Sequence, residues 1–340
     1  MAGRAGGEAR DVLVLLSPGQ GSQQPGMLLP WLDLPDARPR LAAWSRRTGL
    51  DLLRLGTTGS ADEVRDTAVA QPLLTAAALL TADALTGGTT PGAVCGHSVG
   101  ELSVLAIAGV LTADDAVALA TTRGAAMAQA AAARPTGMSA VLGGDPEQVQ
   151  EAIAAAGLQV ATVNVAGQVV VGGDRDALDA FAADPPPRAR VRPLEVAGAF
   201  HTPAMGAARE ALEQAVRDLR PAPPRCAVVA NADGAVVADG AELVTRLVGQ
   251  LTGPVRFDLC LTALADLGVT AAVELAPGGT LAALAKRALP AARVVALKEP
   301  GDLAAARALR TEPAHGTPAD STPADSRPAD STVARTAVPA

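Results

Sequence analysis

The stretch AVCGHSVGELSVLAIA, residues 93–108, indicates the fold of this chain of 340 residues. Residues 93–95 are apolar and strand-like, GHSVGE at 96–101 forms a sharp turn with Ser98 between two glycines, and residues 102–108 have the composition of a buried helix. A Gly-x-Ser-x-Gly turn between a strand and a helix is typical of a nucleophile elbow, which exposes the serine hydroxyl at the helix N-terminus. The isolated motif also occurs by chance, so the interpretation depends on the flanking strand and helix.

Strands alternate with helices over most of the chain. Strand-like runs occur at 12–16, 93–95, 271–275 and 294–297, and helical patterns occur at 71–85, 102–108 and 280–288. Such alternation predicts a parallel sheet covered by helices on both faces. We therefore expect an α/β fold with a large, hydrolase-like domain.

The middle of the chain follows a different order. Strands are predicted at 138–142, 159–165, 168–171 and 190–196, and helices at 145–156 and 175–182. This order, β-α-β-β-α-β, is that of a ferredoxin-like unit. We predict a large domain in two parts, 1–127 and 199–310, with a small ferredoxin-like subdomain, 128–198, inserted between them. A cleft between the two would be the natural ligand site.

The sequence changes character after residue 310. The segment TPADSTPADSRPADSTVARTAVPA repeats a five-residue unit rich in Pro, Asp and Ser. A segment of this composition cannot bury enough apolar surface to fold. We predict that residues 311–340 form a disordered tail.

The composition limits the classes of partner and location. The formal net charge is −7, so binding to nucleic acid or to an anionic membrane is not expected. The first apolar run, at 12–16, is too short for a signal peptide or a membrane span. The cysteines Cys95, Cys226 and Cys260 lack metal-ligand spacing. We therefore expect reduced thiols in a cytoplasmic protein.

A nucleophilic serine needs a base, which is usually histidine. The chain contains His97, His201 and His315. His315 lies in the predicted tail, and neighbouring side chains on a tight turn diverge, so His97 is expected to pack near the site or contact substrate. His201 follows the last strand of the small subdomain, next to the expected cleft. A lone histidine is more often a hydrogen-bonded core residue, but the lack of another base for Ser98 favours a catalytic role.

Two further features bear on the substrate. Arg123 shares one helix face with Leu119 and Met127, where an unpaired arginine is costly. It could form an internal salt bridge, extend to solvent, or bind the carboxylate of a ligand. The N–H of Val99 is placed to stabilise an oxyanion, and the glycine turn at 18–21 could offer N–H groups to the same oxyanion.

These segments, in this order, resemble the malonyl-CoA:acyl carrier protein transacylases and the related acyltransferase domains of polyketide synthases. The resemblance spans about residues 11–310. It includes SPGQGSQQPGM (17–27), AQPLL (70–74), GHSVGE (96–101), TTRGAAM around Arg123, NVAGQVVVGG (164–173), GAFHTPAM (198–205), VGQLTGPVRF around Gln250 and ELAPGGTLAALAKR (274–287).

The resemblance implies a catalytic role for five matched positions. Ser98 would be the nucleophile and His201 the base. Gln20 and Val99 would provide the N–H groups of an oxyanion hole. Gln250 would hold the imidazole through its backbone carbonyl, whereas the residues alone left open whether a carboxylate or a carbonyl does so.

The resemblance also implies how the acyl group is recognised. Arg123 would bind the malonyl carboxylate, and His97 would lie at the substrate. Phe200, directly before the base, is similar to malonyl-selective rather than methylmalonyl-selective members. The chain departs from many members at Ser17, where they have Phe, and at Phe257, where they have Trp.

The implied reaction is a ping-pong transfer. Ser98 would take malonyl from coenzyme A, and the phosphopantetheine thiol of an acyl carrier protein would then accept it, with His201 as base in both steps. The resemblance implies no metal and no cofactor beyond the thioester substrate, a monomer, and a role in fatty acid or polyketide biosynthesis. Four basic residues are candidates for contacting the coenzyme A phosphates or the carrier protein: Arg188, Arg190, Lys286 and Arg287.

Two other functions share some of these features. A serine hydrolase or thioesterase has the same elbow, but typically places its histidine near the end of the folded chain, after an acid. A non-catalytic scaffold that binds carrier protein would need none of Ser98, His201 and Gln20. The acceptor of the acyl group, water or carrier protein, would discriminate between the two enzymes.

Overall fold

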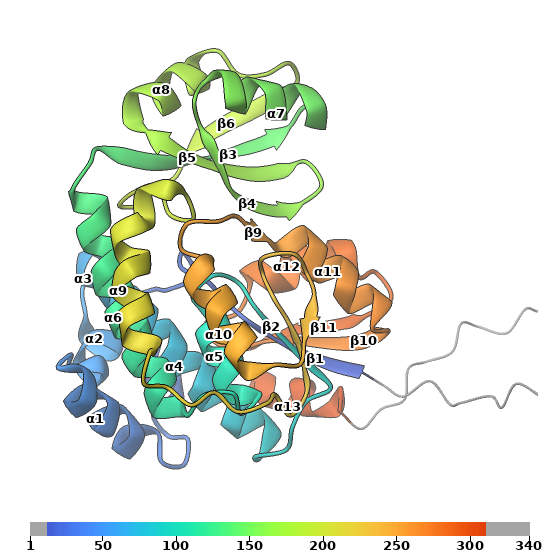
Figure 1. The fold of residues 1–340 in the computed structure, drawn as a ribbon. Coiled ribbons are helices and arrows are strands. Elements are labelled where there is room, and N and C mark those ends of the chain that lie inside the picture. The colour runs from blue at the N-terminus through green and yellow to red at the C-terminus, as the bar shows by residue number, and fades with distance from the viewer. Residues whose placement is uncertain (1–11, 311–340) are drawn as a thin grey trace, which may run out of the picture.

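The structure of the protein, a computed structural model, describes residues 12–310. Its larger part contains the strands β1 (Val12–Ser17), β2 (Ala93–Gly96), β7 (Ala227–Val229), β8 (Val236–Val237), β10 (Val269–Glu274) and β11 (Arg293–Ala296). They form one sheet in the order β11-β10-β1-β2-β7-β8. Figure 1 labels β11, β10, β1 and β2 of this sheet. Neighbours run parallel, except that β8 is antiparallel to β7. The parallel sheet expected from the alternation is therefore present, and the predicted tail lies outside the described residues.

Helices cover both faces of this sheet. Successive residues of a strand point to opposite faces, and in β1 Leu15 joins one apolar cluster while Val14 and Leu16 join another. The second cluster includes side chains of α11 (Phe257–Asp266) and α12 (Thr280–Ala288). The first includes side chains of α1 (Ala37–Thr48), α2 (Leu52–Thr58), α3 (Ala61–Arg65), α4 (Thr67–Thr86), α5 (Gly100–Ile107), α6 (Ala113–Ala132), α9 (Gly206–Val216), α10 (Gly240–Gly249) and α13 (Asp302–Ala308), and of the 3₁₀ turns η1 (Leu29–Trp31) and η2 (Pro203–Met205).

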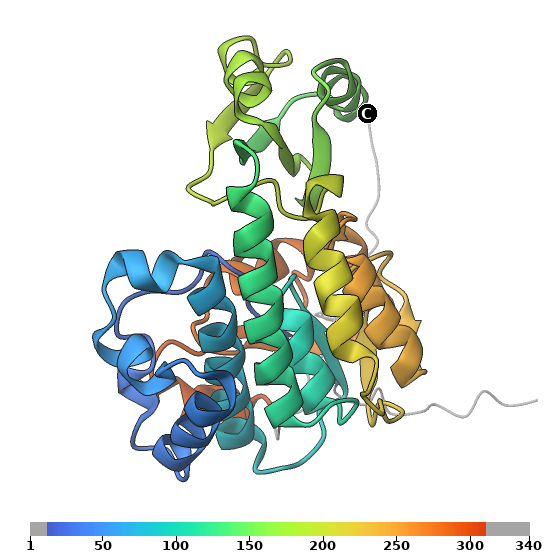
Figure 2. The same ribbon diagram turned by 60° about the vertical axis from the view of Figure 1, so that its left-hand side comes forward.

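The helix α4 is apolar around its whole circumference. It is the one helix within residues 12–310 that is long and apolar enough to span a membrane, with a mean hydropathy of 1.4, but 78% of that window is buried inside the protein. A helix that is apolar all round belongs in a core. It lies beside α6, which also packs along α9, as Figure 2 shows. These long helices are therefore core elements next to the sheet.

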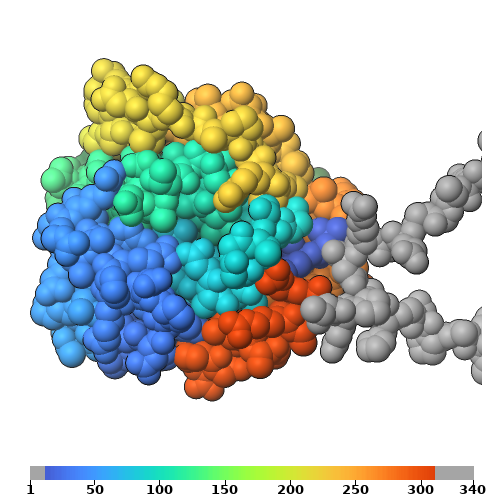
Figure 3. All heavy atoms as spheres, turned by 90° about the horizontal axis from the view of Figure 1, so that it is seen from below, coloured from blue at the N-terminus to red at the C-terminus, as the bar shows by residue number. Residues whose placement is uncertain are grey.

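The end of the described chain returns to α4. Arg307 Nη2 donates to the carbonyl oxygen of Ala84 at 2.7 Å, and Arg310 Nη1 donates to that of Leu85 at 3.0 Å. Figure 3 shows this last segment in red beside the blue and teal segments of the first third of the chain. The two parts of the large domain are thereby joined on its lower face.

A second sheet lies above the first. Its strands are β3 (Thr136–Gly143), β4 (Gln159–Val165), β5 (Gln168–Asp174), β6 (Ala189–Pro193) and β9 (Val255–Arg256), in the order β6-β3-β5-β4-β9. The first four are antiparallel neighbours and carry the helices α7 (Pro146–Ala155) and α8 (Arg175–Ala183). This is the ferredoxin-like order, with a separate apolar core that includes Val141, Ile153 and Phe181. The predicted fold class, a parallel α/β domain with a ferredoxin-like subdomain, is confirmed.

The structure differs from the predictions in three places. The strand predicted at 190–196 ends at Pro193. The strand β9 was not predicted; it joins the small sheet beside β4 although it lies about ninety residues further along the chain. In addition, α6 continues to Ala132, so the predicted boundary at 128 falls inside a helix. The division into domains stays a prediction.

Candidate active site

Ser98 lies in a tight turn between β2 and α5. Its backbone has φ +55, in the left-handed region that is unfavourable for a side chain. A Cβ on Gly96 would lie 2.2 Å from the carbonyl carbon of Gly100, and a Cβ on Gly100 would lie 2.2 Å from the carbonyl oxygen of Ser17. The two glycines are therefore required for the strand and helix to approach this closely, which is the geometry expected of a nucleophile elbow.

His201 contacts the hydroxyl of Ser98. His201 Nε2 lies 2.7 Å from Ser98 Oγ, and His201 Nδ1 lies 2.8 Å from the main-chain oxygen of Gln250. A carbonyl oxygen can only accept, so Nδ1 carries the proton and the lone pair of Nε2 faces the serine. Burial, together with the nearby charge of Arg123, lowers the pKa of His201 to about 3. The imidazole is neutral near pH 7 and able to take a proton from Ser98.

Arg123, on α6, is completely buried beside this pair. Its Nη1 donates to Gln71 Oε1 at 2.7 Å, and its Nη2 donates to Gln250 Oε1 at 2.8 Å and lies 3.3 Å from Ser98 Oγ. Within residues 12–310 it forms no ion pair, and its Nε has no hydrogen-bond partner. Burial lowers its pKa to about 10, so the group stays charged at neutral pH. The internal salt bridge and the extension to solvent considered from the sequence are both wrong, and the binding of a ligand carboxylate stays a prediction.

Two main-chain N–H groups are candidates for an oxyanion hole: that of Val99, which follows Ser98 in the chain, and that of Gln20, which lines the same cavity as Ser98. Val99 occupies the N-cap position of α5, and Gln20 lies in the glycine turn after β1, held by a 3.0 Å hydrogen bond from its Nε2 to Thr67 Oγ1. In the described part of the chain the N–H groups of Val99 and Gln20 have no hydrogen-bond acceptor. Unpaired N–H groups next to a nucleophile fit an oxyanion hole.

A cavity of about 300 Å³ opens onto Ser98 and His201 between the two sheets. Gln20, Phe200 and His97 are among its lining residues. His97 Nε2 lies 3.0 Å from Asn164 Oδ1 on β4, and the centroid of its ring lies 5.3 Å from that of Phe257. The volume is at the lower end of the range for small-molecule sites. The cavity lies in the cleft expected between the large part and the small subdomain.

Four residues around the site were missed from the sequence as contributors: Gln71, Glu101, Asn164 and Asn231. Gln71 and Glu101 stand within the segments AQPLL and GHSVGE, and Asn164 opens NVAGQVVVGG. Asn231 follows β7 in a stretch without a motif, and its Oδ1 accepts the Ser98 N–H at 2.8 Å. A single sequence contains no signal that would place Asn231 beside Ser98, because 133 residues separate the two.

The four basic residues proposed as partner contacts do not reach the cavity. Arg188, Arg190, Lys286 and Arg287 are all exposed, and none of them lines the space around Ser98. Contact with the carrier protein therefore stays a prediction.

The buried imidazole should make stability depend on pH. The unfolded chain protonates His201 near its ordinary pKa of 6.5, whereas the folded protein does so near 3. The stability that neutral His201 contributes is therefore present above pH 6.5 and is lost as the pH falls toward 3. When the pH falls from 6.5 to 5, we expect the free energy of unfolding of the wild type to decrease by about 2 kcal/mol more than that of His201→Gln. Urea unfolding at both pH values measures this difference, and parallel losses in the two proteins would contradict it.

Comparison with known proteins adds independent information. The acyl transferase domain family matches residues 14–311. The malonyl CoA-acyl carrier protein transacylase of Mycobacterium tuberculosis is 51% identical over 296 residues, which cover 86% of this chain and 98% of that protein. The crystal structure of MCAT from the same organism superposes with a TM-score of 0.84 at 50% identity, covering 87% of this chain and 99% of the other. A type II PKS acyl-carrier protein in complex with its malonyl-transacylase provides a further match, with a TM-score of 0.81 at 29% identity, covering 88% of this chain and 99% of that one.

Proposed function

Because the chain belongs to the acyl transferase domain family, we propose that it moves malonyl from malonyl-CoA to the phosphopantetheine thiol of an acyl carrier protein. The observation that supports the malonyl group is Arg123, a buried cation without an ion-pair partner in the described chain, with its Nη2 3.3 Å from Ser98 Oγ. A buried arginine is strongly destabilising unless an anion accompanies it. The free carboxylate of a malonyl thioester is such an anion.

In the first half-reaction Ser98 Oγ attacks the thioester carbonyl while His201 Nε2 takes its proton. The oxygen of the tetrahedral intermediate accepts from the N–H groups of Gln20 and Val99. The coenzyme A thiolate leaves with the proton from His201, and malonyl remains as an ester on Ser98. Gln250 keeps the imidazole in the required tautomer through its main-chain oxygen.

The second half-reaction repeats these steps with another thiol. The phosphopantetheine thiol of the carrier protein gives its proton to His201 and attacks the ester, and Ser98 recovers its proton when the intermediate collapses. One base and one oxyanion hole thus act in both directions. This proposal needs no group beyond the two substrates, and it agrees with the carrier-protein complex found for a relative.

The alternative function is that of a serine hydrolase or thioesterase, a class of enzyme that hydrolyses acyl thioesters with a similar nucleophile elbow. In that class the histidine typically comes late in the fold, whereas His201 is followed here by about a hundred described residues. The choice between fatty acid and polyketide biosynthesis, the cytoplasmic location and the monomeric state are further predictions that rest on the resemblance.

Release of coenzyme A distinguishes transfer from hydrolysis. We expect malonyl-CoA alone to give a burst of about one equivalent of coenzyme A per enzyme and then slow turnover. Carrier protein with its phosphopantetheine arm should restore multiple turnover, and the same carrier without the arm is the matched control. Rapid turnover without any carrier would mean that water is the acceptor and that the protein is a hydrolase.

A further inference from the structure

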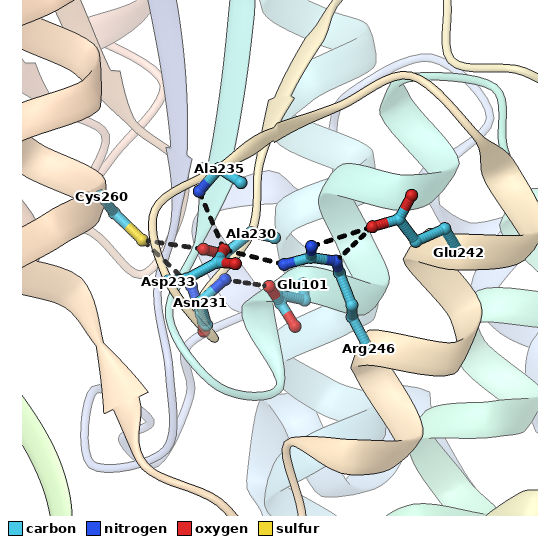
Figure 4. Close-up of polar contacts among 8 residues, drawn as sticks. All are labelled: Glu101, Ala230, Asn231, Asp233, Ala235, Glu242, Arg246 and Cys260. Carbon is cyan, nitrogen blue, oxygen red and sulfur yellow. Dashed lines mark hydrogen bonds and ion pairs between the residues drawn. The ribbon is translucent and has the colours of Figure 1, made fainter.

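Glu101, on the first turn of α5, is a buried carboxylate beneath the serine turn. Its side chain is 7% exposed. Glu101 Oε1 accepts the main-chain N–H of Asn231 at 2.7 Å, and Oε2 accepts Gln250 Nε2 at 2.7 Å. Figure 4 shows the contact with Asn231 and shows Arg246 paired with Asp233 and Glu242 instead. Glu101 therefore has no ion-pair partner in the described chain, and its two acceptor oxygens serve the loops that follow β7 and α10.

The chemistry of its neighbours fixes the orientation of the Gln250 amide. Both oxygens of the Glu101 carboxyl group accept N–H groups in the structure, although burial raises the pKa of this group to about 7. A guanidinium only donates. The Gln250 side chain lies between the two, with Nε2 toward Glu101 and Oε1 toward Arg123 Nη2 at 2.8 Å. Reversal of the amide would place two donors face to face at Arg123 and two acceptors face to face at Glu101. The carboxylate thus determines which end of the amide meets the guanidinium.

Asn231 is the second residue that the Glu101 carboxyl group holds. Its N–H is held by Glu101, and its Oδ1 accepts both Ser98 N–H at 2.8 Å and Gln250 Nε2 at 3.0 Å. Its Nδ2 donates to the carbonyl oxygen of Gly96 at 2.7 Å. These bonds hold both ends of the left-handed turn at Ser98. Loss of the contact between Glu101 and Asn231 should slow the transfer of every acyl group equally, because this contact acts on the nucleophile.

The contact between Glu101 and Gln250 has a different consequence. Arg123 is held by two neutral amide oxygens, those of Gln71 and Gln250, and the Glu101 carboxyl group lies on the far side of the Gln250 amide. A directly paired carboxylate would occupy the guanidinium and oppose a second anion. Through Gln250, the Glu101 carboxyl group orients an acceptor toward the buried cation and leaves the cation able to bind an anionic acyl group.

We propose that Glu101 is a positioning residue that sets the selectivity of the enzyme for carboxylated acyl groups, by orienting the Gln250 amide and through it Arg123. This inference rests on the proposed function, in which Arg123 binds the malonyl carboxylate. Glu101 touches no substrate atom in this scheme. Its effect appears in the ratio of kcat/KM for malonyl-CoA to kcat/KM for acetyl-CoA.

The test is Glu101→Gln, which preserves shape but has one acceptor oxygen in place of two. Either Asn231 N–H or Gln250 Nε2 would then face a donor, and Arg123 would lose its oriented acceptor. We expect the malonyl-to-acetyl ratio to fall about 10- to 100-fold, as for loss of a hydrogen bond to a charged group. Glu274→Gln is the matched control, because Glu274 is likewise a buried carboxyl group but accepts from the N–H groups of Gly279, Leu281 and Ala282. Its ratio should stay at the wild-type value even if its melting temperature falls.

The same measurement in an Arg123→Ala background separates this inference from the proposed function. If Glu101 acts through Arg123, Glu101→Gln should leave the ratio of the Arg123→Ala protein unchanged. An Arg123→Ala ratio equal to that of the wild type would overturn the malonyl assignment itself. If the malonyl-to-acetyl ratio falls strongly in Arg123→Ala but is unchanged in Glu101→Gln, only the role of Glu101 is overturned.

A second variant covers the case in which Glu101→Gln does not fold. Gln250→Met removes the relaying amide but keeps the main-chain oxygen that contacts His201. We expect the same fall in the malonyl-to-acetyl ratio, with the folded state checked by its melting temperature. A folded Gln250→Met protein with the wild-type ratio would overturn the inference.

Discussion

Ser98→Ala is expected to abolish the covalent acyl-enzyme and to lower transfer by at least about 10,000-fold. The hydroxyl that would carry malonyl lies 2.7 Å from His201 Nε2, and water positioned there could not form an enzyme-bound ester. The fold should survive, because the turn is held by its main chain, including the bond from Ser98 N–H to Asn231. Mass spectrometry of the intact protein after incubation with malonyl-CoA measures the ester.

Ser103→Ala provides the matched control for this change. Ser103 lies on α5, five residues further along, and its buried Oγ has no hydrogen-bond partner in the described structure. We expect this variant to form the ester and to transfer malonyl like the wild type. Covalent labelling of Ser98→Ala by malonyl-CoA would show that another residue is the nucleophile.

Arg123→Ala is expected to change the choice of acyl group as well as the rate. Removal of one partner of a desolvated charge pair costs about 2–5 kcal/mol. At about 1.4 kcal/mol per factor of ten, kcat/KM for malonyl-CoA should fall by about 30- to 3,000-fold. Acetyl-CoA has no carboxylate to lose, so its kcat/KM should hold steady or rise.

The comparison of the two thioesters contains its own control. Both are assayed with the same variant and the same carrier protein, so a general loss of folded enzyme affects them equally. Parallel losses for malonyl-CoA and acetyl-CoA would mean that Arg123 only holds Gln71 and Gln250 in place. The proposed malonyl recognition would then lose its physical basis.

Local patterns in the sequence were sufficient for the framework of the site. The six residues GHSVGE were enough to predict the tight turn, because only glycine fits beside Ser98 there. The strand and the helix on either side were predicted from their composition. The ferredoxin-like order at 138–196 is likewise encoded in successive short segments. The arginine on the apolar stripe of α6 marked a position that needed an explanation, and the sequence left open an internal salt bridge, an extension to solvent and a ligand carboxylate.

Long-range polar contacts could not be predicted in this way. Glu101, Asn231 and Gln250 come from three segments that are distant in the chain, and nothing in their local sequence encodes the hydrogen bonds among them. The pairing of β9 with β4 has the same origin, because a two-residue strand has no periodicity. Such features depend on how the whole chain folds rather than on any one segment.

A chase of isolated malonyl-enzyme shows whether one serine carries the acyl group between two thiols. Enzyme is labelled with malonyl-CoA, separated from free coenzyme A and digested, and the labelled peptide is identified. We expect the label on Ser98, stable in buffer over the time in which carrier protein with its phosphopantetheine arm removes it completely. Label on another residue, or loss to water as fast as to the carrier, would contradict the proposed transfer.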